Sequence, residues 1–313
     1  MANDFEVGVD VAVPPQAAWA LAGDPGRVGE WFPPVEECVM EGDVRRVTMA
    51  GGPVLVERIV DHDDAARSYS YSVIEGGYRM VDTAARYGNE RGVGRALAAA
   101  SVPREELFVV TKLRGSQQGY EEAMGAFEES RERLGLEYVD LYLIHWPLPG
   151  LDRYVASWRA SVELRERGLA RSIGVSNFTP AHVERLERET GVLPAVNQIE
   201  MHPDFPQAPL RGWCAGRGIV VQSWSPLGAG SALLSDPAIG AIARARGRTP
   251  AQVVLRWHLQ AEAIPIPKSS DPRRLAQNLD VFGFALDDAE MAALAALDRG
   301  HRQGGDPDVY VEM

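Results

Sequence analysis

The sequence has few cysteines, no long apolar run and no excess of positive charge. Cys38 and Cys214 are its only cysteines among 313 residues, which excludes a disulfide framework and a cysteine-rich metal site. No apolar run is long enough to span a bilayer, and the opening residues MANDFEVGVD lack the apolar core of a signal peptide. We therefore expect a cytoplasmic protein with two free thiols and no membrane partner.

Negative charge dominates the composition. The chain has 44 Asp and Glu against 32 Lys and Arg, which gives a formal net charge of −12. Such a balance disfavours a nucleic-acid or anionic-membrane surface, so we expect neither partner. An anionic cofactor would have to be held by a few local Lys or Arg side chains. The length suits one large α/β domain or a domain with a smaller module.

From residue 77 onward, short apolar runs alternate with amphipathic segments. Runs rich in Val and Ile without strict alternation indicate parallel strands buried on both faces. These runs are RMVDT, LFVVTK, VDLYLIHW, RSIGVSN, AVNQIE, IVVQSW and AIPIPKS. Seven strand–helix units predict a (β/α)8 barrel with one strand unaccounted for.

Helices are expected between these strands. In TPAHVERLERETG, Thr179 is the expected N-cap and Pro180 the first helical residue. The helix GYEEAMGAFEESRERLG follows Ser116 and Gln117 and is expected to end at Gly135. GVGRAL at residues 92–97 resembles the start of a dinucleotide fingerprint but lacks its third glycine, so we interpret it as helix packing. MHPDF has metal-ligand residue types without a second nearby histidine, so we interpret it as a loop and expect no metal site.

Residues 1–76 do not show this alternation of short apolar strands and amphipathic helices. EVGVDVAV alternates, and PPQAAWALAGDPGRVGEWF is typical of a helix followed by a loop. VRRVTMAG, PVLVERIVD and SYSYSVIE are typical of antiparallel strands, with AGGP at residues 50–53 as a hairpin connection. The composition changes around Glu75–Gly77, which predicts one segment over residues 1–76 and a barrel over residues 77–313.

Polar or aromatic side chains follow the ends of the seven predicted strands, where barrel enzymes place their active residues. They are Asp82, Lys112, His145, Ser176 with Asn177, Gln198, Trp224 and Lys268. Each alone has an ordinary explanation, such as a turn former, a surface charge or a core histidine. Their shared position at the same end of consecutive strands predicts an active site.

The candidate proton donor is Tyr87, just beyond the first of these strand ends. An ammonium beside a phenol stabilises the phenolate, and a carboxylate keeps the ammonium charged and positioned; Lys112 and Asp82 can take these parts. His145 can donate a hydrogen bond to a carbonyl oxygen. The flat face of Trp224 suits stacking on a nicotinamide ring. This set predicts hydride reduction of a carbonyl group with Tyr87 as general acid.

Residues 77 to about 308 resemble the aldo-keto reductases, in the branch of bacterial diketogluconate reductase-like enzymes. The resemblance is carried by GYRMVDTAARYGNE, LFVVTKL, LGLEYVDLYLIHWP, IGVSNF, PAVNQIEMHP, WSPLG, GRTPAQVVLRWHLQ and IPKSSDPRRLAQNLDVFGF. It implies an NADPH-dependent oxidoreductase that reduces small aldehydes, ketones or dicarbonyls to alcohols. The catalytic tetrad that it implies is Asp82, Tyr87, Lys112 and His145.

The same resemblance implies where cofactor and substrate bind. The implied cofactor-binding residues are Ser176, Asn177, Gln198, Trp224, Ser225, Leu227, Lys268, Ser269, Arg274, Gln277 and Asn278. Trp146 is the implied substrate contact. A preference for NADPH is explained if Lys268 and Arg274 make charged contacts to its 2′-phosphate. Asp271 beside them would weaken that preference through like-charge repulsion.

Residues 1 to about 75 resemble instead the first half of a START-like, polyketide-cyclase helix-grip domain. VPPQAAWALAGDPGRVGEWFPPV and VRRVTMAGGPVLVERIVDHDDAARSYSYSV carry this likeness. The sequence thus predicts a TIM barrel of aldo-keto reductase type that lacks its usual first strand and helix, fused to an α+β helix-grip-like segment. Because an open barrel leaves strand edges unpaired, one hypothesis is that SYSYSVIE or VLVERIV fills the gap.

Two other functions stay open beside the reductase. The chain is an NADPH-binding protein with little or no turnover if the replaced first strand and loop abolish catalysis. It is a lipid- or polyketide-binding module if Trp19, Trp31 and Phe32 line a cavity, although a small local core is the simpler interpretation. The expected partner is a small carbonyl substrate, and the expected state is a monomer or weak homo-oligomer.

Overall fold

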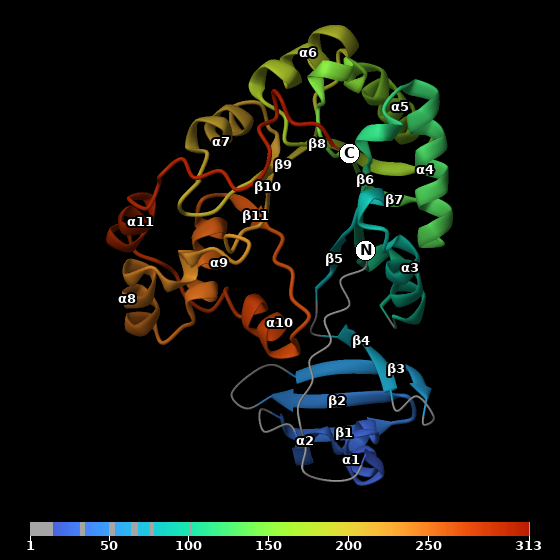
Figure 1. Cartoon of the computed structure of the whole chain (residues 1–313), viewed down its shortest axis with the longest axis vertical. Helices are drawn as coiled ribbons and strands as arrows, with labels where there is room; N and C mark the ends of the chain where they lie inside the picture. Colours follow the sequence, from blue (N-terminus) through green and yellow to red (C-terminus); the bar gives the residue numbers. More distant parts are fainter. Residues whose placement is uncertain are drawn as a thin grey trace. The chain divides into compact units, whose positions relative to one another are not determined.

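The structure is a computed structural model that describes residues 15–31, 35–49, 54–63, 68–75, 78–100 and 102–312. The chain divides into two compact units. One comprises Met1–Met80 with Arg91–Leu107, and the other comprises Val81–Glu90 with Phe108–Met313. Within the described residues the strands form two separate sheets, one antiparallel and one parallel (Figure 1).

The antiparallel sheet follows a helical start. Its elements are α1 (Pro15–Ala22), η1 (Pro25–Arg27), α2 (Val28–Trp31), β1 (Val35–Glu41), β2 (Val44–Met49), β3 (Val54–Asp63) and β4 (Ser68–Glu75). The strand order among the described residues is β1-β2-β3-β4. The predicted helical start and the last three strands are confirmed, but the loop expected after the first helix instead contains η1 and α2. The predicted strand EVGVDVAV and the connection AGGP lie outside the described residues.

Strand β1 was not predicted from the sequence. Its residues VEECVME break the alternation of polar and apolar side chains, and Glu36 and Glu37 are both exposed. The pairing of β1 with β2 shifts register between Val35 and Glu37, which is the signature of a β-bulge or a similar irregularity. The irregular pairing explains why a period of two is not visible in this strand.

The hypothesis that VLVERIV or SYSYSVIE completes the barrel is wrong for the described residues. VLVERIV lies in β3, which pairs with β2 on one edge and with β4 on the other, so neither edge is free for a barrel strand. SYSYSVIE lies in β4, which pairs with β3 and belongs to the antiparallel sheet. A pattern of alternating residues specifies a strand but not the partner to which it will bond.

The parallel sheet contains every strand predicted after residue 77. In the described part of the chain its order is β11-β10-β9-β8-β7-β6-β5, an open sheet that ends at β5 and β11. The strands are β5 (Met80–Asp82), β6 (Phe108–Leu113), β7 (Val139–Ile144), β8 (Ala170–Ser176), β9 (Val196–Glu200), β10 (Val220–Trp224) and β11 (Ala263–Pro265). The fold of these residues is therefore α/β, with the seven parallel strands predicted for a (β/α)8 barrel that has one strand unaccounted for.

Helices α4 to α7 lie on the outer side of these strands (Figure 1). The helices that follow α2 are α3 (Glu90–Ala99), α4 (Tyr120–Leu134), α5 (Tyr154–Glu166), α6 (Pro180–Thr190), α7 (Ala208–Ala215), α8 (Pro237–Arg246), α9 (Pro250–Gln260), α10 (Pro272–Leu279) and α11 (Asp288–Ala295). None of the helices in the described ranges has the length and apolar content that a membrane crossing requires.

The helix signals in the sequence are confirmed where they were specific. Thr179 caps α6 in a capping box with His182, and Pro180 is its first residue. Gly135 ends α4 in the left-handed conformation, with φ of 66°, and donates to the carbonyls of Arg131 and Glu132. Residues 92–97, which resemble a dinucleotide fingerprint, lie within helix α3.

The centre of the sheet is buried on both sides. Every residue of β7 is buried, and Tyr142 of this strand meets Phe127 of α4 edge to face with ring centroids 5.0 Å apart. Asp140 of β7 is also buried, and its carboxylate accepts a hydrogen bond from the Val109 amide at 2.9 Å. The resulting rigid sheet fixes the strand ends that carry the polar residues predicted to form the site.

We predict that Gly174→Ala, in β8, destabilises the barrel by about 1–3 kcal/mol because the added methyl group has no space. A Cβ there would lie 2.7 Å from the Val196 carbonyl oxygen and 2.8 Å from Leu143 Cδ2. The matched control is Gly125→Ala in α4, where a Cβ meets nothing within 4 Å. The control is expected to gain about 0.5–1 kcal/mol from helix propensity. Urea unfolding measures both, and an unchanged midpoint for Gly174→Ala would contradict the packing described here.

Candidate active site

A buried ion pair joins the ends of β5 and β6. Lys112 has no exposed surface, and its Nζ donates hydrogen bonds to Asp82 Oδ1 and, at 3.1 Å, to the Thr83 carbonyl oxygen. Burial by itself lowers the pKa of Lys112, but the attraction of Asp82 and of Tyr87 outweighs it and holds this pKa above its usual value of 10.5. The ammonium is therefore charged at neutral pH.

Tyr87 stands over this ion pair. It is the last residue of η2 (Ala85–Tyr87), and Gly88 behind it has φ of 68°. The hydroxyl of Tyr87 is 3.5 Å from Lys112 Nζ, at the outer limit of a hydrogen bond. The side chain is open to solvent, with 49% of the residue exposed. The phenol is thus in contact with a buried cation and accessible to a substrate.

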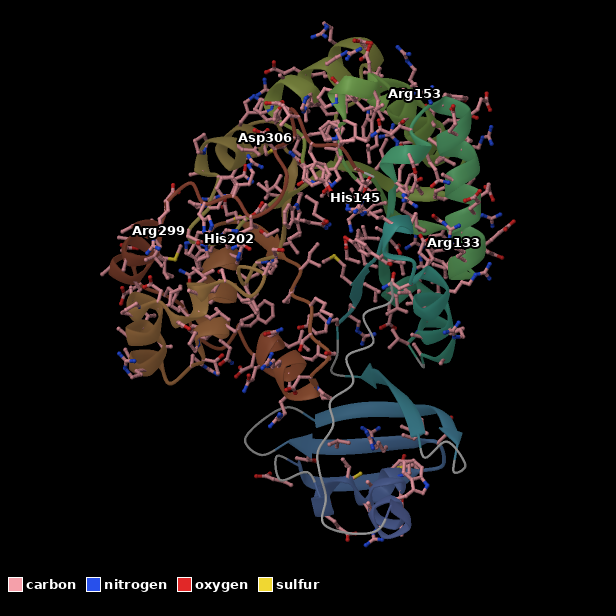
Figure 2. The ribbon with its side chains drawn as sticks, viewed as in Figure 1. Arg133, His145, Arg153, His202, Arg299 and Asp306 are labelled. Carbon is pink, nitrogen blue, oxygen red and sulfur yellow. The ribbon has the colours of Figure 1, made fainter. Side chains whose placement is uncertain are left out.

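His145 follows β7 and faces Tyr87 edge to face, with ring centroids 5.8 Å apart. It lies on the inner side of the strands, whereas Arg133 of α4 and Arg153, which immediately precedes α5, lie on the outer side (Figure 2). Its Nδ1 is 2.9 Å from Glu312 Oε1, a close contact in which the structure forms no hydrogen bond between the two atoms. Burial lowers the pKa of His145, and Lys112 lowers it too; together they outweigh the opposite effect of Glu312. The ring is therefore neutral at neutral pH.

A chain of hydrogen bonds orders the next strand ends. Asn177 Nδ2 donates to the His145 carbonyl oxygen and to Ser176 Oγ, both at 3.0 Å. Trp224 Nε1 donates to Asn177 Oδ1 at 2.8 Å, which fixes the plane of the indole. Gln198 Nε2 donates to Asp82 Oδ2 at 2.8 Å. Three successive strand ends are thereby tied to the ion pair and to His145.

These groups surround one pocket of about 400 Å³. Its lining residues are Asp82, Tyr87, Asn89, His145, Trp146, Ser176, Asn177, Gln198, Trp224, Ser225, Ile266 and Lys268. Lys112 lies beneath them, fully buried. Apart from Asn89 and Ile266, all the lining residues were predicted from the sequence as site residues. Besides Lys112, five predicted site residues lie outside the lining: Leu227, Ser269, Arg274, Gln277 and Asn278.

Asp271 pairs with the cations of its own region. Its carboxylate caps α10 and lies 3.3 Å from Arg273 Nη2 and 3.9 Å from Arg274 Nε. Burial raises the pKa of Asp271, but the hydrogen bonds and charge of Arg273 outweigh burial and hold this pKa below its usual value. The carboxylate is thus ionised, while the Arg274 side chain remains 75% exposed.

Sequence reasoning missed four residues that contact the site. Asn89 and Ile266 line the pocket, Tyr310 stacks on Trp146 with ring centroids 4.1 Å apart, and Glu312 reaches His145. Asn89 accepts a hydrogen bond from Thr83 Oγ1 at 2.7 Å, which steadies the loop of Tyr87. The available signal for Tyr310 was an aromatic residue in an otherwise polar stretch, HRQGGDPDVY. Glu312 had no local signal.

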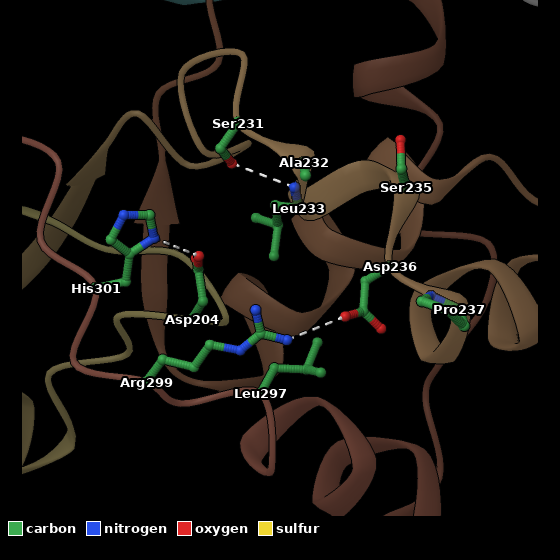
Figure 3. Close-up of a pocket in the computed structure, with 10 residues that line it drawn as sticks. All are labelled: Asp204, Ser231, Ala232, Leu233, Ser235, Asp236, Pro237, Leu297, Arg299 and His301. Carbon is green, nitrogen blue, oxygen red and sulfur yellow. Dashed lines mark hydrogen bonds and ion pairs between the residues drawn. The ribbon is translucent and has the colours of Figure 1, made fainter.

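A second pocket, of about 290 Å³, shares no lining residue with the first. Its polar side chains pair with one another: His301 Nδ1 lies 3.2 Å from Asp204 Oδ2, and Arg299 Nη2 lies 3.6 Å from Asp236 Oδ2 (Figure 3). Asp204 also binds the buried His202 of the MHPDF loop, whose Nε2 is 3.0 Å from Glu200 Oε1. These mutual pairs stabilise the loops.

Comparison with known proteins shows the family. The family model for the aldo/keto reductase family matches residues 49–299. A 2,5-diketo-D-gluconic acid reductase B of Corynebacterium sp. (strain SHS752001) is 51% identical over 242 residues, 77% of this chain and 87% of that protein. An aldo-keto reductase of Mycolicibacterium smegmatis is 50% identical over 248 residues, 79% of this chain and 90% of that protein. The chain therefore belongs to the aldo/keto reductase family.

Solved structures agree with this assignment. Gox0644 in its apo form superposes with a TM-score of 0.72 at 52% identity, covering 75% of this chain and 85% of that one. A point mutant of Gox0644 solved in complex with NADPH gives the same TM-score at 51% identity, with the same coverage of both chains. A second family model, polyketide cyclase / dehydrase and lipid transport, matches residues 3–93, which confirms the resemblance predicted for the N-terminal segment.

We predict that Lys112→Met lowers the free energy of unfolding by about 3–5 kcal/mol, because it leaves the Asp82 carboxylate in a buried site without its cation. The Asp82 side chain is only 8% exposed, so water from the pocket replaces the ammonium only in part. The double variant Asp82→Asn with Lys112→Met removes both charges and is expected to lose less than the single variant. Urea unfolding of both variants tests this. Equal losses would show that the pair is not coupled.

Proposed function

We propose that the chain reduces small aldehydes, ketones or dicarbonyls to alcohols with NADPH, and that Tyr87 donates the proton. One observation carries the proposal: the buried Lys112 ammonium contacts both the Asp82 carboxylate and the Tyr87 hydroxyl beneath a pocket of about 400 Å³. The relatives named as a diketogluconate reductase and as an NADPH complex support the substrate class and the cofactor. In this proposal residues 77–313 carry the reductase and residues 1–76 are a separate segment.

The donor set of the pocket fits NADPH. Trp224 offers a flat aromatic face, locked by its hydrogen bond to Asn177, on which a nicotinamide ring can stack. Ser176, Asn177 and Gln198 present hydroxyl and amide groups suited to a carboxamide, and Lys268 adds a cation to the same pocket. We assign the remaining contacts to Ser225, Leu227, Ser269, Arg274, Gln277 and Asn278. When bound, NADPH supplies the hydride that reduces the carbonyl carbon.

Side chains of the pocket donate the proton and stabilise the phenolate that remains. Tyr87 gives its hydroxyl proton to the carbonyl oxygen as the carbon accepts the hydride, which leaves an alcohol and a phenolate. The Lys112 ammonium, 3.5 Å away, stabilises that phenolate, and Asp82 holds the ammonium in place. His145 lies across the pocket from the phenol, where it orients the carbonyl oxygen. Trp146, backed by Tyr310, provides an apolar wall that excludes water from the substrate.

We predict that Tyr87→Phe lowers kcat for carbonyl reduction about 10²–10⁴-fold, since the substitution removes only the hydroxyl that donates the proton. NADPH binding, followed by quenching of tryptophan fluorescence, is expected to persist. The control is Tyr142→Phe, which removes a buried hydroxyl that has no hydrogen-bond partner among the described residues and lies outside the site. Oxidation of NADPH measured by absorbance with an aldehyde, a ketoacid and a diketone tests both variants. Turnover unchanged in Tyr87→Phe would refute the assigned role.

The open sheet favours a second candidate function. In the described residues the parallel sheet ends at β5 and β11 without a strand between them, and β5 carries Asp82. A protein that keeps the cofactor contacts but has lost turnover would show fluorescence quenching by NADPH and no reduction of any carbonyl. However, both Lys112 and Gln198 hold the Asp82 carboxylate in place although it lies at the end of the sheet, and this favours the reductase over the binding protein.

We predict that Arg274→Ala raises the Kd for NADPH about tenfold and leaves the Kd for NADH nearly unchanged, because only NADPH has the 2′-phosphate that we assign to this cation. The matched control is Arg273→Ala on the same helix. Arg273 is bound by Asp271 through its backbone and side chain and is not assigned to the phosphate. Titration of both cofactors by fluorescence tests the assignment. An equal loss for NADH and NADPH would contradict it.

A further inference from the structure

Glu312 places a buried carboxylate against the catalytic histidine. Its side chain has no exposed surface, its Oε2 accepts a hydrogen bond from the Gly115 amide, and its Oε1 lies 2.9 Å from His145 Nδ1. Arg86 Nη1 lies 3.6 Å from the same Oε1. Residue 312 thus reaches the site from the 306–312 segment, far along the chain from both partners.

The position is shaped for this side chain. A Cβ on residue 115 would lie 2.6 Å from Glu312 Oε2 and 2.5 Å from Leu148 Cδ1, so only glycine lets the carboxylate approach the backbone there. Tyr310, two residues earlier, stacks on Trp146 and anchors the segment beside the pocket. Burial raises the pKa of Glu312, but His145, the Gly115 amide and Arg86 together outweigh it and hold this pKa below its usual value. The group is a carboxylate at neutral pH.

A carboxylate can only accept a hydrogen. A neutral imidazole has one ring proton, and placing its Nδ1 lone pair 2.9 Å from an anionic oxygen would be repulsive. The neutral ring therefore carries its proton on Nδ1. Its other nitrogen, Nε2, then has a lone pair and cannot donate to a carbonyl oxygen.

We propose that Glu312 is a positioning residue that fixes the Nδ1–H tautomer of His145, so that Nε2 donates to a substrate carbonyl only when the ring is an imidazolium. This inference rests on the proposed function and adds pH control to it. The charged and titratable groups that face the ring are Lys112, Asp82, Tyr87 and Glu312, with Arg86 behind Glu312. Because the imidazolium is the donating form, kcat/KM for reduction falls as pH rises through the pKa of His145. The fall is about tenfold per pH unit above that pKa.

Glu312→Gln tests the inference with little change in shape. Because the Gly115 N–H is a donor, the carboxamide oxygen of the variant side chain must face it. The carboxamide NH₂ then faces His145 Nδ1 and donates a hydrogen bond to it. The neutral ring then carries its proton on Nε2 and donates without being protonated. We predict that the variant raises kcat/KM at pH 7.5 by more than about tenfold, because the pKa of His145 lies below its usual value of 6.5, and that it loses the acid dependence. A merely structural role of Glu312 would lower kcat/KM equally at all pH values.

The control is Asp308→Asn, which alters another carboxylate of the same segment. Asp308 lies 3.4 Å from Nε2 of His182, which is outside the pocket lining, and its side chain is 65% exposed. The control is expected to keep the pH profile of the unsubstituted chain. A changed profile in this control would show that any disturbance of the segment has the same effect, which overturns the specific role of Glu312.

The tautomer is read directly by ¹⁵N NMR of the histidine ring nitrogens, with the His145 signal assigned from its absence in His145→Gln. We expect a protonated Nδ1 in the unsubstituted chain at pH 7.5 and a protonated Nε2 in Glu312→Gln. A protonated Nε2 in the unsubstituted chain overturns the inference, whether or not the variant folds. Absence of NADPH oxidation by the unsubstituted chain at every pH instead overturns the proposed function, and the pH control with it.

Discussion

The site depends on one buried ion pair, between Lys112 and Asp82. A lysine with no exposed surface is tolerated only where an anion and hydrogen-bond acceptors replace water, and here Asp82 and the Thr83 carbonyl do so. The pair joins β5, the edge strand of the parallel sheet, to β6. Through Gln198 it also reaches β9, on the far side of the pocket. The ion pair to which we assign the stabilisation of the Tyr87 phenolate thus also connects the strand ends that carry the other groups.

The parallel sheet and most of the pocket were predictable from the sequence because each depends on local pattern. Strands buried on both faces give continuous apolar runs, and such runs end where the backbone leaves the sheet. Polar residues at those ends, such as Asp82 and Gln198, must therefore share one rim. The segment before residue 77 was predictable only as strands. The alternation in VLVERIV indicates a strand, but its bonding to β2 and β4 depends on neighbours that the alternation does not specify.

Glu312 was unpredictable for a different reason. Its partners are Gly115 and His145, and its contact with the Gly115 amide spans 197 positions of the sequence. No periodicity or motif predicts a contact between residues so far apart in the sequence. The local sequence VEM, residues 311–313, does not indicate that the carboxylate of Glu312 is buried. The stacking of Tyr310 on Trp146 has the same character. Contacts of this kind are fixed by tertiary packing.

The 306–312 segment also has a consequence for the order of folding. Its backbone is held within itself by bonds from Val309 and Tyr310 to the Asp306 carbonyl, and it contributes no strand to either sheet among the described residues. The segment follows every strand of the parallel sheet along the chain, so it is synthesised after them. Asp82, Tyr87, Lys112 and His145 all precede it, and the contact of Glu312 with His145 therefore depends on packing that forms only after those strands have been made.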